Sequence, residues 1–518
     1  MHYAAAPIFL TSEIRQVEQD VLSRSPRPDL MERAGLAAAE LARSLMREKD
    51  KRILLFAGPG NNGGDALVAA RHLKQWWFDV AVVYTGDESK LPDDAKAALK
   101  AWREAGGQLF SDVPPDFRHD LIVDGLFGIG LQRPLEGRYA ALIDRINTSG
   151  NRVLALDIPS GLNADSGAVL GHAVRADQTI TFMGLKPGLL TLDGPDHAGE
   201  VHVASLGIDL PERSAPGGWL IPESILRRVL APRPRNSHKG TYGTVGVIGG
   251  APGMAGAALL AGRAALKLGA GKVRVGLLAD SPGVDAGQPE LMLRPAQDLL
   301  KMPELACIAC GPGLGQSQAA GHALAAVLEH PAPLVLDADA LNLLATDPGL
   351  QKALQARRSP SLLTPHPAEA ARLLGKTTAE VQSDRVAAAL QIATRFSAAV
   401  VLKGSGSICA LAGGDWYVNV TGNPGMASAG MGDVLTGILA GLLAQGADAG
   451  IALLAGVYLH GAAADWLAEN GTGPVGMTAS EVIDAARLVL NAAGSEQSST
   501  EQSSTEQSGT EQSGTEPS

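Results

Sequence analysis

Residues 53–65 read Ile-Leu-Leu-Phe-Ala-Gly-Pro-Gly-Asn-Asn-Gly-Gly-Asp, an apolar β-rich run followed at once by a glycine-rich loop. A helical pattern from Asp65 to Trp76 comes next, so the stretch predicts a strand, a loop and a helix in succession. Ligands collect where parallel strands end, and glycines allow the backbone to approach them closely. The side chains of Asn61, Asn62 and Asp65 add polar groups at this point.

The same alternation continues to about Asp209, with a second helical pattern at Asp93–Ala105. Strands are expected at Ile53–Ala57, Val80–Tyr84, Leu121–Asp124, Val153–Asp157 and Gln178–Phe182. Strands that alternate with helices are typical of right-handed βαβ units. The first half therefore predicts a doubly wound, Rossmann-like three-layer α/β domain, which we place at residues 1–215.

The pattern breaks between Pro211 and Pro234, where five prolines indicate a linker. It then resumes with a long alanine-rich helix at Met254–Leu268. Further strands are expected at Thr244–Ile248, Val273–Gly276, Leu334–Asp337 and Ala399–Lys403. A second α/β domain is expected at 225–493. The polar Ser-Glu-Gln-Ser-Ser-Thr repeats of 494–518 have no apolar residue to bury, so we expect a disordered tail without a catalytic role.

The amino-acid composition and net charge limit the classes of function that are possible. The chain has 518 residues, of which 62 are glycine and 19% are charged, as in compact, loop-rich α/β proteins. The net charge is −11, and the tail holds five glutamates without Lys or Arg, so the rest carries about −6. No basic groove for nucleic acid or an anionic membrane is expected. An anionic ligand must then be held by backbone amides, a few cations or a metal.

The three cysteines, Cys307, Cys310 and Cys409, are too few for a disulfide framework and lack a second ligand pair for zinc. We therefore expect core cysteines and a cytoplasmic location. Residues 1–10 lack a basic region followed by a sustained apolar one, and no later segment offers about 20 uninterrupted apolar residues, so we also expect no secretion signal and no membrane span.

Three consecutive strand ends of the first half carry oxygen-bearing side chains. The strand ending at Asp124 enters the glycine-rich loop Gly125–Pro134, and the next ends at Asp157-Ile-Pro-Ser160. Taken singly, Asp124 or Asp157 could be a helix-capping or turn residue. Together, Asn62, Asp124 and Ser160 offer hard oxygen donors that suit a hard cation better than zinc, which leaves Asp157 for proton transfer.

Three strings in this order, Gly-Pro-Gly-Asn-Asn-Gly-Gly-Asp, Val-Asp-Gly-Leu-Phe-Gly-Ile-Gly and Leu-Asp-Ile-Pro-Ser-Gly-Leu, resemble the NAD(P)H-hydrate epimerase family. The resemblance covers about residues 1–210. It implies a potassium ion at Asn62, Asp124 and Ser160, and Asp157 as the proton-transferring carboxylate. It also implies that the substrate, hydrated NADH or NADPH, is bound by Asn61, Asn62, Gly63, Gly64, Asp65, Gly128, Ile129, Gly130, Leu131, Gln132, Arg133 and Pro134.

The second half contains another glycine-rich loop, Asn423-Pro-Gly-Met-Ala-Ser-Ala-Gly-Met-Gly-Asp433, which leads into an apolar helical run. Such a loop presents free N–H groups and a helix dipole to an anion, and the carboxylate of Asp433 is better explained as a base than as a phosphate ligand. The turn from Lys403 to Ser407 offers amides, hydroxyls and a cation to nucleotide phosphates. His366 lies between two prolines and could equally be a rigid-turn residue.

With Gly311-Pro-Gly-Leu-Gly315 and Leu336-Asp-Ala-Asp-Ala-Leu-Asn342, these segments resemble a ribokinase-like domain, and more closely the ADP-dependent NAD(P)H-hydrate dehydratase family. The resemblance spans about residues 225–493. It implies that Asp433 takes the hydroxyl proton of the (S)-hydrate and that the hydroxyl oxygen then attacks ADP, which releases AMP. The phosphate ester that forms then loses phosphate, giving NAD(P)H. The resemblance also implies a nucleotide site at Lys403, Gly404, Ser405, Gly406, Ser407 and Gly432, and a hydrate pocket at Ala255, Gly313 and His366.

The two resemblances together imply a bifunctional isomerase and lyase for metabolite repair, with magnesium accompanying the nucleotide and a homo-oligomeric assembly. Two other hypotheses are compatible with the sequence. One is a ribokinase-type kinase for a small alcohol fused to a Rossmann-like nucleotide-binding module. The other is a non-enzymatic N-terminal module, since doubly wound domains host many functions.

Overall fold

The computed structural model describes residues 6–24, 28–210, 216–280 and 283–510, with side chains described up to Gly494. The chain divides into two compact units, one formed by Ala6–Trp219 and the other by Leu220–Val381 and the chain from Arg385 onward. Each unit contains a largely parallel sheet covered by helices, which confirms the predicted α/β class. The division falls inside the proline-rich stretch that the sequence marks as a linker.

The N-terminal unit is built on a seven-stranded sheet with the order β4-β3-β2-β5-β6-β7-β8, in which every neighbouring pair is parallel. Its strands are β2 (Arg52–Ala57), β3 (Asp79–Tyr84), β4 (Leu109–Phe110), β5 (Leu121–Gly125), β6 (Arg152–Leu156), β7 (Gln178–Phe182) and β8 (Glu200–Ala204). Its helices are α1 (Thr11–Leu22), α2 (Leu30–Leu45), α3 (Asn61–Gln75), α4 (Asp93–Glu104), α5 (Arg138–Asn147) and α6 (Gly194–Ala198). Two further short strands, β1 (Pro7–Ile8) and β9 (Gly218–Leu220), pair antiparallel with each other and are not part of this seven-stranded sheet.

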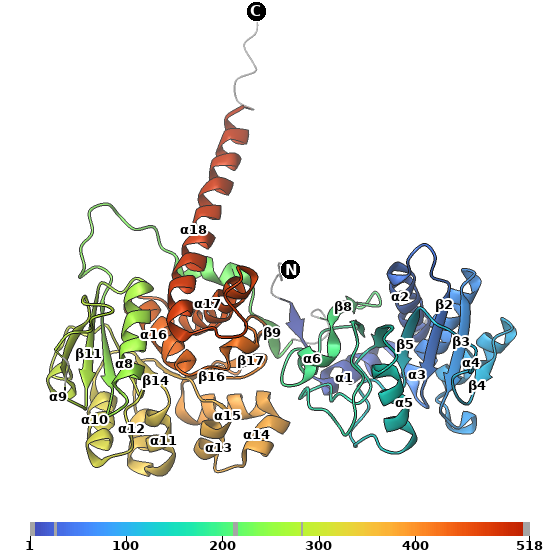
Figure 1. Ribbon diagram of the computed structural model, residues 1–518, viewed down its shortest axis with the longest axis horizontal. Helices are drawn as coiled ribbons and strands as arrows, with labels where there is room; N and C mark the ends of the chain where they lie inside the picture. The colour runs from blue at the N-terminus through green and yellow to red at the C-terminus, as the bar shows by residue number, and fades with distance from the viewer. Residues whose placement is uncertain (1–5, 25–27, 211–215, 281–282, 511–518) are drawn as a thin grey trace, which may run out of the picture. The chain divides into compact units, whose positions relative to one another are not determined.

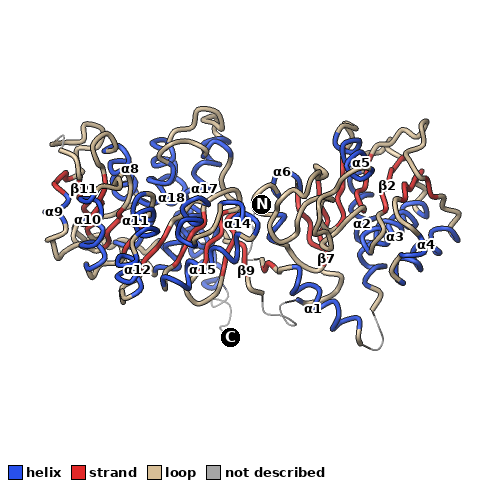
Figure 2. Tube along the Cα trace, turned by 90° about the horizontal axis from the view of Figure 1, so that it is seen from below, coloured by secondary structure: helices blue, strands red, loops and turns tan. Residues whose placement is uncertain are grey.

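The two faces of this sheet are covered by different helices. In β2, Ile53 and Leu55 pack in the core with α2, α3 and α4, whereas Leu54 and Phe56 pack with α5 on the other face. This alternation has the period of two that a strand buried on both faces requires. Figure 2 shows the resulting three layers, with the strands between α2, α3 and α4 on one side and α5 on the other.

The C-terminal unit repeats the parallel plan over a longer sheet, in which the strands from β10 onward follow the order β12-β11-β10-β13-β14-β15-β16-β17-β18. The pairs from β12 to β16 are parallel, and β17 and β18 are antiparallel additions. The strands are β10 (Thr244–Gly249), β11 (Lys272–Leu277), β12 (Met292–Pro295), β13 (Cys307–Cys310), β14 (Leu334–Leu336), β15 (Ser361–Leu363), β16 (Ala399–Leu402), β17 (Ser407–Ala410) and β18 (Trp416–Asn419). The parallel order brings the ends of β10, β13, β14, β15 and β16 to one edge.

Helices cover both faces of this second sheet. They are α8 (Ala255–Lys267), α9 (Ala296–Leu299), α10 (Gln318–Glu329), α11 (Asp339–Thr346), α12 (Pro348–Gln355), α13 (Pro367–Leu374), α14 (Thr378–Ser383), α15 (Arg385–Phe396), α16 (Met431–Ala444), α17 (Ala449–Glu469) and α18 (Ala479–Thr510). One core cluster joins β10 and β11 to α8, α16, α17 and α18, while α10 to α15 lie on the opposite side in Figure 1. All three cysteines are free and buried in this unit, as predicted.

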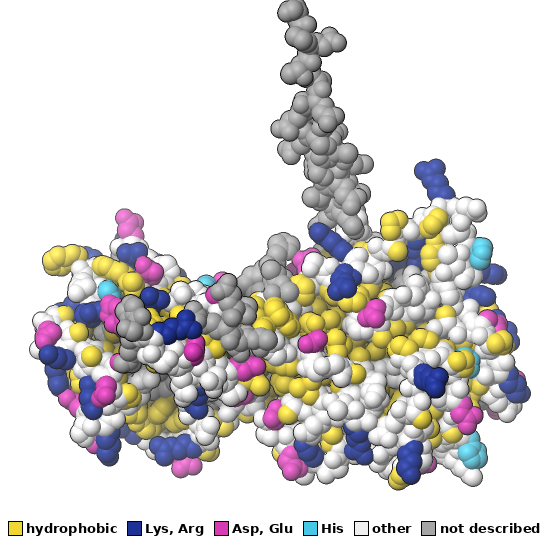
Figure 3. All heavy atoms as spheres, turned by 180° about the vertical axis from the view of Figure 1, so that it is seen from behind, with side chains coloured by type: hydrophobic (Ala, Val, Ile, Leu, Met, Phe, Trp, Pro, Cys, Tyr) yellow, Lys and Arg dark blue, Asp and Glu magenta, His cyan; other side chains and the backbone are white. Residues whose placement is uncertain are grey.

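Helix α17 (Ala449–Glu469) is, within the described ranges, the one helix long and apolar enough to cross a membrane by length and composition. The apolar window of this helix is 67% buried inside the unit, and core helices of this kind meet the same criteria. On the face shown in Figure 3, hydrophobic side chains gather over the C-terminal unit.

Three boundaries differ from the sequence expectation. Helix α3 begins at Asn61 instead of Asp65, and α16 begins at Met431, so the last part of each glycine-rich loop is the first helical turn. Gly60 and the left-handed Gly430 (φ 87°) precede these helices and supply the change in backbone direction. Helix α18 continues to Thr510, through most of the segment predicted to be disordered, and 511–518 lie outside the described residues. The disorder stays a prediction.

Candidate functional sites

The glycine-rich loop after β2 is closely packed against the loop after β5. A Cβ atom on Gly58 would stand 1.7 Å from the Leu126 carbonyl oxygen, and one on Gly63 would stand 2.0 Å from the Gly58 carbonyl oxygen. Only glycine fits at these two positions without moving the backbone. The first turn of α3 therefore lies directly at the edge of the sheet, with its N–H groups available to an anion.

Asp124 and Ser160 form a buried pair at this edge. The Ser160 amide donates to Asp124 Oδ2 at 2.8 Å, and the Ser160 hydroxyl donates to Asp124 Oδ1 at 2.7 Å. Both side chains are fully buried, and burial raises the pKa of Asp124 to about 6 although these hydrogen bonds oppose the rise. A cation at this place would favour the ionised carboxylate.

Asn62 lies against the start of the loop after β5, since a Cβ atom on Gly125, the residue after Asp124, would stand 3.1 Å from the Asn62 carbonyl oxygen. It is 7% exposed, but neither its side-chain oxygen nor its side-chain nitrogen has a hydrogen-bond partner in the described part of the chain. A buried amide without partners costs about 1–3 kcal/mol, so a ligand is expected to supply them. Among the described residues, no group of three or more His, Cys, Asp and Glu could hold a metal. A site here would use amide, hydroxyl and carboxylate oxygens, and this donor set fits the predicted hard cation.

Asp157 is held from both sides. Lys186 Nζ donates to its Oδ1 at 2.8 Å, and the Ile129 amide donates to its Oδ2 at 3.0 Å. Asp157 has a left-handed backbone conformation (φ 64°), which is uncommon for residues other than glycine. This conformation directs its carboxylate into the loop after β5. A Cβ atom on Gly128 would stand 2.6 Å from Asp157 Oδ2 and 3.4 Å from Asn62 Cγ, so the structure brings Asn62, Gly128 and Asp157 together.

Lys186 was not predicted from the sequence. It is 0% exposed, and its ammonium also donates to Thr181 Oγ1 and to the Phe182 carbonyl oxygen, each at 2.7 Å. The available signal was its isolation, because it is the one charged residue between Thr179 and Leu192. A single lysine in so apolar a run is expected to be paired when buried.

Two further carboxyl groups interact electrostatically with Asp157. Burial, and then the charge of Asp157, raise the pKa of Glu18 on α1. Burial likewise raises the pKa of Asp65 well above its usual value, with added repulsion from Asp157 and Glu18. Asp65 was predicted to bind the substrate, whereas the contribution of α1 could not be read from the sequence. In the rest of the predicted segment, Gln132, Arg133 and Pro134 are exposed.

In the C-terminal unit the predicted residues also converge on one edge of the sheet. The loops after β10 and β13 run side by side, since the Ala251 amide donates to the Gly313 carbonyl oxygen at 2.7 Å. Gly313 has a left-handed backbone (φ 57°), and a Cβ atom there would stand 2.5 Å from the Met254 carbonyl oxygen, just before Ala255. Ala255 and Gly313 are therefore neighbours, as the predicted hydrate pocket requires.

His366 directly precedes α13 and serves as its N-cap. Its Nδ1 accepts from the Ala368 amide at 3.1 Å, and its pKa is lowered by burial and by the charge of Lys403. The capping role corresponds to the rigid-turn alternative, but the ring still lies at the edge where β15 ends. The Lys403 amide donates to the Pro365 carbonyl oxygen at 2.9 Å, which ties the loop after β16 to the His366 segment.

Lys403 is 22% exposed, and its Nζ donates to Asp337 Oδ1 at 2.8 Å. A Cβ atom on Gly432 would stand 3.2 Å from that Nζ, so the ammonium lies directly at the start of α16. Gly404 and Ser405 are exposed, whereas Gly406 and Ser407 are half-buried, and the Ser407 hydroxyl donates to the Gly404 carbonyl oxygen at 3.0 Å. The predicted nucleotide loop is thus an open turn beside a helix N-terminus.

Asp433 is the third residue of α16, and burial, followed by repulsion from Asp337, raises its pKa to about 6. The preceding glycine-rich loop is anchored by α17, since the Gly422 amide and the Asn423 side chain donate to Asp465 at 2.7 and 3.0 Å. A half-buried carboxyl with a pKa near 6 beside a helix N-terminus has the properties of a general base close to neutral pH.

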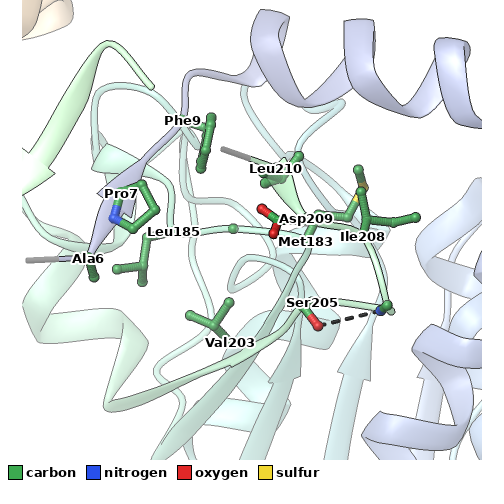
Figure 4. Close-up of a pocket in the computed structure, with 12 residues that line it drawn as sticks. Ala6, Pro7, Phe9, Met183, Leu185, Val203, Ser205, Ile208, Asp209 and Leu210 are labelled. Carbon is green, nitrogen blue, oxygen red and sulfur yellow. Dashed lines mark hydrogen bonds between the residues drawn. The ribbon is translucent and has the colours of Figure 1, made fainter. Parts of the chain in front are cut away.

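A pocket of about 540 Å³ lies elsewhere in the N-terminal unit, lined by apolar side chains that include Phe9, Leu185 and Val203 (Figure 4). None of its lining residues belongs to the predicted sites. Its lining includes Ala6 and Leu210, which adjoin residues outside the described ranges, and we assign it no ligand.

Comparison with known proteins agrees with two separate sites. Residues 245–487 match a family described as NAD(P)H-hydrate dehydratase, and residues 27–188 match one described as YjeF-related protein N-terminus. A bifunctional NAD(P)H-hydrate repair enzyme of Escherichia coli (strain K12) is 39% identical, over 93% of this chain and 94% of that protein. One from Coxiella burnetii is 40% identical, over 93% of this chain and 99% of its own length.

Among solved structures, an ADP/ATP-dependent NAD(P)H-hydrate dehydratase from Bacillus subtilis, co-crystallised with ATP and Mg²⁺, is 34% identical. It covers 53% of this chain and 98% of its own, with a TM-score of 0.47.

The chain thus has two α/β units, each with a carboxylate at the edge of its parallel sheet beside a helix N-terminus, and this arrangement is that of a two-site enzyme. The chain belongs to the family of bifunctional NAD(P)H-hydrate repair enzymes.

Proposed function

We propose that this protein repairs hydrated NADH and NADPH in two reactions. The N-terminal unit interconverts the R and S hydrates, and the C-terminal unit uses ADP to dehydrate the S hydrate to NAD(P)H. The observation that carries the proposal is the pair of separately built carboxylates, Asp157 and Asp433, each at the ligand edge of its own parallel sheet. Family membership supports both halves.

In the epimerase reaction Asp157 is the group that moves the proton. The hydrated ring carbon carries both a hydroxyl and the ring nitrogen, so removal of the hydroxyl proton allows the carbon–nitrogen bond to open as the nitrogen takes up a proton. Closure on the opposite face gives the other epimer and reverses the proton transfers. Lys186 and the Ile129 amide keep the carboxylate in one orientation during both steps.

The substrate is held in this proposal by Asn61–Asp65 and Gly128–Pro134. Potassium would bind at Asn62, Asp124 and Ser160; the unpartnered side chain of Asn62 supports this assignment. When bound, the ion would supply a positive charge to this site.

In the dehydratase reaction Asp433 takes the proton of the substrate hydroxyl, and the resulting oxygen attacks the terminal phosphorus of ADP. The bond to AMP breaks, and the amides at the start of α16 stabilise the negative charge on the transferring group. Hydroxide leaves poorly but phosphate leaves well, so the ring nitrogen can then expel phosphate. Loss of a proton from the adjacent carbon completes the ring of NAD(P)H.

The nucleotide is assigned to Lys403–Ser407 and Gly432, and the hydrate to Ala255, Gly313 and His366. Magnesium would be carried by the phosphates of the nucleotide. We further infer a cytoplasmic enzyme and a homo-oligomer; the buried free cysteines support the first, and the hydrophobic surface in Figure 3 supports the second. Light scattering of the purified protein tests the oligomeric state.

Product analysis separates this function from that of a small-alcohol kinase. Incubation with the S hydrate of NADH and ADP, followed by ³¹P NMR, is expected to show AMP and inorganic phosphate in equal amounts with the NADH formed. A phosphoester that persists without NADH would overturn the dehydratase assignment and favour the kinase.

A further inference from the structure

Asp337 is a buried carboxylate that neither site assignment uses. It follows directly after β14, is 1% exposed, and lies between two partners from distant parts of the chain. Lys403 Nζ donates to its Oδ1 at 2.8 Å, and the Thr436 hydroxyl donates to its Oδ2 at 3.0 Å. Thr436 is fully buried in α16, one turn after Asp433.

These contacts join the two parts of the proposed nucleotide site. Lys403 begins the phosphate-binding turn, and Thr436 belongs to the helix whose first turn carries Gly432 and Asp433. A Cβ atom on Gly432 would stand 3.2 Å from Lys403 Nζ and 3.4 Å from Asp337 Oδ2. The carboxylate of Asp337 therefore lies immediately beneath the place where the phosphoryl group would be transferred.

We propose that Asp337 is a positioning residue of the dehydratase site, which fixes the Lys403 ammonium and the first turn of α16 so that the phosphoryl group and Asp433 meet in one geometry. The inference rests on the proposed function. Because one N–H of the Lys403 ammonium donates to Asp337, the ammonium is held in one position. Its two other N–H groups can then donate to a phosphate.

The charges around Asp433 fit this role. Asp337 and Asp339 raise the pKa of Asp433 and Lys403 lowers it, after the larger effect of burial. Burial also acts to raise the pKa of Asp337, but Lys403 and the hydroxyls of Thr364 and Thr436 keep it below its usual value, so Asp337 is ionised near neutral pH. Around Lys403 itself lie Glu369, which raises its pKa, and the rings of His366 and His460, whose pKa values it lowers.

The test compares Asp337→Asn, Thr436→Val and the exposed control Asp415→Asn in the full-length protein. Asp337→Asn is expected to lower kcat for NADH formation about 100-fold, because Asp433 is less basic and the phosphoryl group is misplaced. The KM for ADP should rise because Lys403 is released, and the acid limb of the kcat–pH profile should move to lower pH. Thr436→Val should lower kcat several-fold in a protein that still folds with a modest loss of thermal stability, because Asp337 keeps its bond to Lys403, whereas Asp415→Asn should behave as wild type.

A double-mutant cycle with Lys403→Met provides the decisive comparison. Because Asp337 acts partly through Lys403, the loss in the double variant Asp337→Asn/Lys403→Met should be clearly smaller than the two single losses combined. Fully additive losses would overturn the proposal, as would a wild-type acid limb and wild-type KM for ADP in a folded Asp337→Asn protein. Should Asp337→Asn fail to fold, wild-type kinetics in Thr436→Val would overturn it. If the wild-type protein forms no NADH with ADP, it is the proposed function that fails.

Discussion

Asp157 in the N-terminal unit is bound on both carboxylate oxygens, whereas Asp433 in the C-terminal unit makes no side-chain hydrogen bond or ion pair within the described residues. Asp157 is fixed by a buried ammonium and a backbone amide. Asp433 has burial and two neighbouring carboxylates that disfavour its charge, with only Lys403 opposing them. A reversible epimerisation needs a carboxylate that returns to the same orientation, while a base in phosphoryl transfer needs an open oxygen and a pKa near neutral.

The largest effect is expected at the open carboxylate. Asp433→Asn should lower ADP-dependent NADH formation about 10³-fold, within the range lost when a general base is removed. Epimerisation should be unchanged, because Asp157 belongs to a separate unit. Absorbance at 340 nm measures the first activity and chromatographic separation of the hydrates the second. Asp415→Asn serves as control, and a parallel loss of epimerisation would contradict two independent sites.

The clamp on Asp157 is tested next. Lys186→Met leaves a buried carboxylate without its cation, which is expected to cost about 3–5 kcal/mol of stability and to slow epimerisation about 100-fold. Thermal denaturation and the rate of hydrate interconversion measure the two effects. Lys100→Met removes an exposed lysine of the same unit and should change neither. An epimerase rate unaffected by Lys186→Met would show that the pair has no part in holding Asp157.

The pH dependence sharpens the comparison. With a pKa of about 6, Asp433 is mostly ionised at pH 7 and only about one tenth ionised at pH 5. The kcat for dehydration of the S hydrate should therefore fall about tenfold as the pH is lowered from 7 to 5, with a midpoint near 6. Measurement at saturating ADP and hydrate gives this profile. A flat profile through pH 5 would indicate that another group takes the proton.

A smaller effect is expected from the cation site. Replacing potassium by tetramethylammonium, or Asn62 by alanine, should slow epimerisation about tenfold, the scale on which losing a supporting contact acts at a metal site. Dehydration of pure S hydrate should be unaffected by Asn62→Ala. A direct readout is the melting temperature of the protein with and without potassium. Potassium should raise the melting temperature of the wild type but not that of Asn62→Ala.

The smallest effect concerns the C-terminal repeats. Truncation after Gly494 keeps the part of α18 whose side chains enter the core, including Val482 and Leu490. Both activities should stay at wild-type values, measured in the same two assays. A loss of either activity would show that the polar repeats have a role that their composition does not predict.

The sequence was sufficient to predict most of the fold, because buried parallel strands are short apolar runs and the helices between them are amphipathic. The predicted strand at Gln178–Phe182 is β7, and the predicted strand at Thr244–Ile248 lies within β10. Helix starts were less predictable, since Asn61 and Met431 follow glycines that are compatible with either a loop or a first helical turn.

Residues that act through contacts with distant segments could not be predicted in the same way. Lys186 meets Asp157 across 29 positions, and Asp337 meets Lys403 across 66 and Thr436 across 99. The sequence shows that such residues are charged and lie in apolar surroundings, but not which partner each one has. Motif residues such as Asp157 and Asp433 were found because the glycines around them lie nearby in the chain.

The most direct test of two independent carboxylates is the final absorbance at 340 nm after ADP is added to a mixture of both NADH-hydrate epimers. Wild type is expected to recover all the NADH. Asp157→Ala should recover quickly only the NADH that was present as S hydrate at the start, and the rest only as fast as the hydrates interconvert spontaneously. Asp433→Ala should recover none. Full recovery at the wild-type rate in Asp157→Ala, or any ADP-dependent recovery near the wild-type rate in Asp433→Ala, would contradict the account.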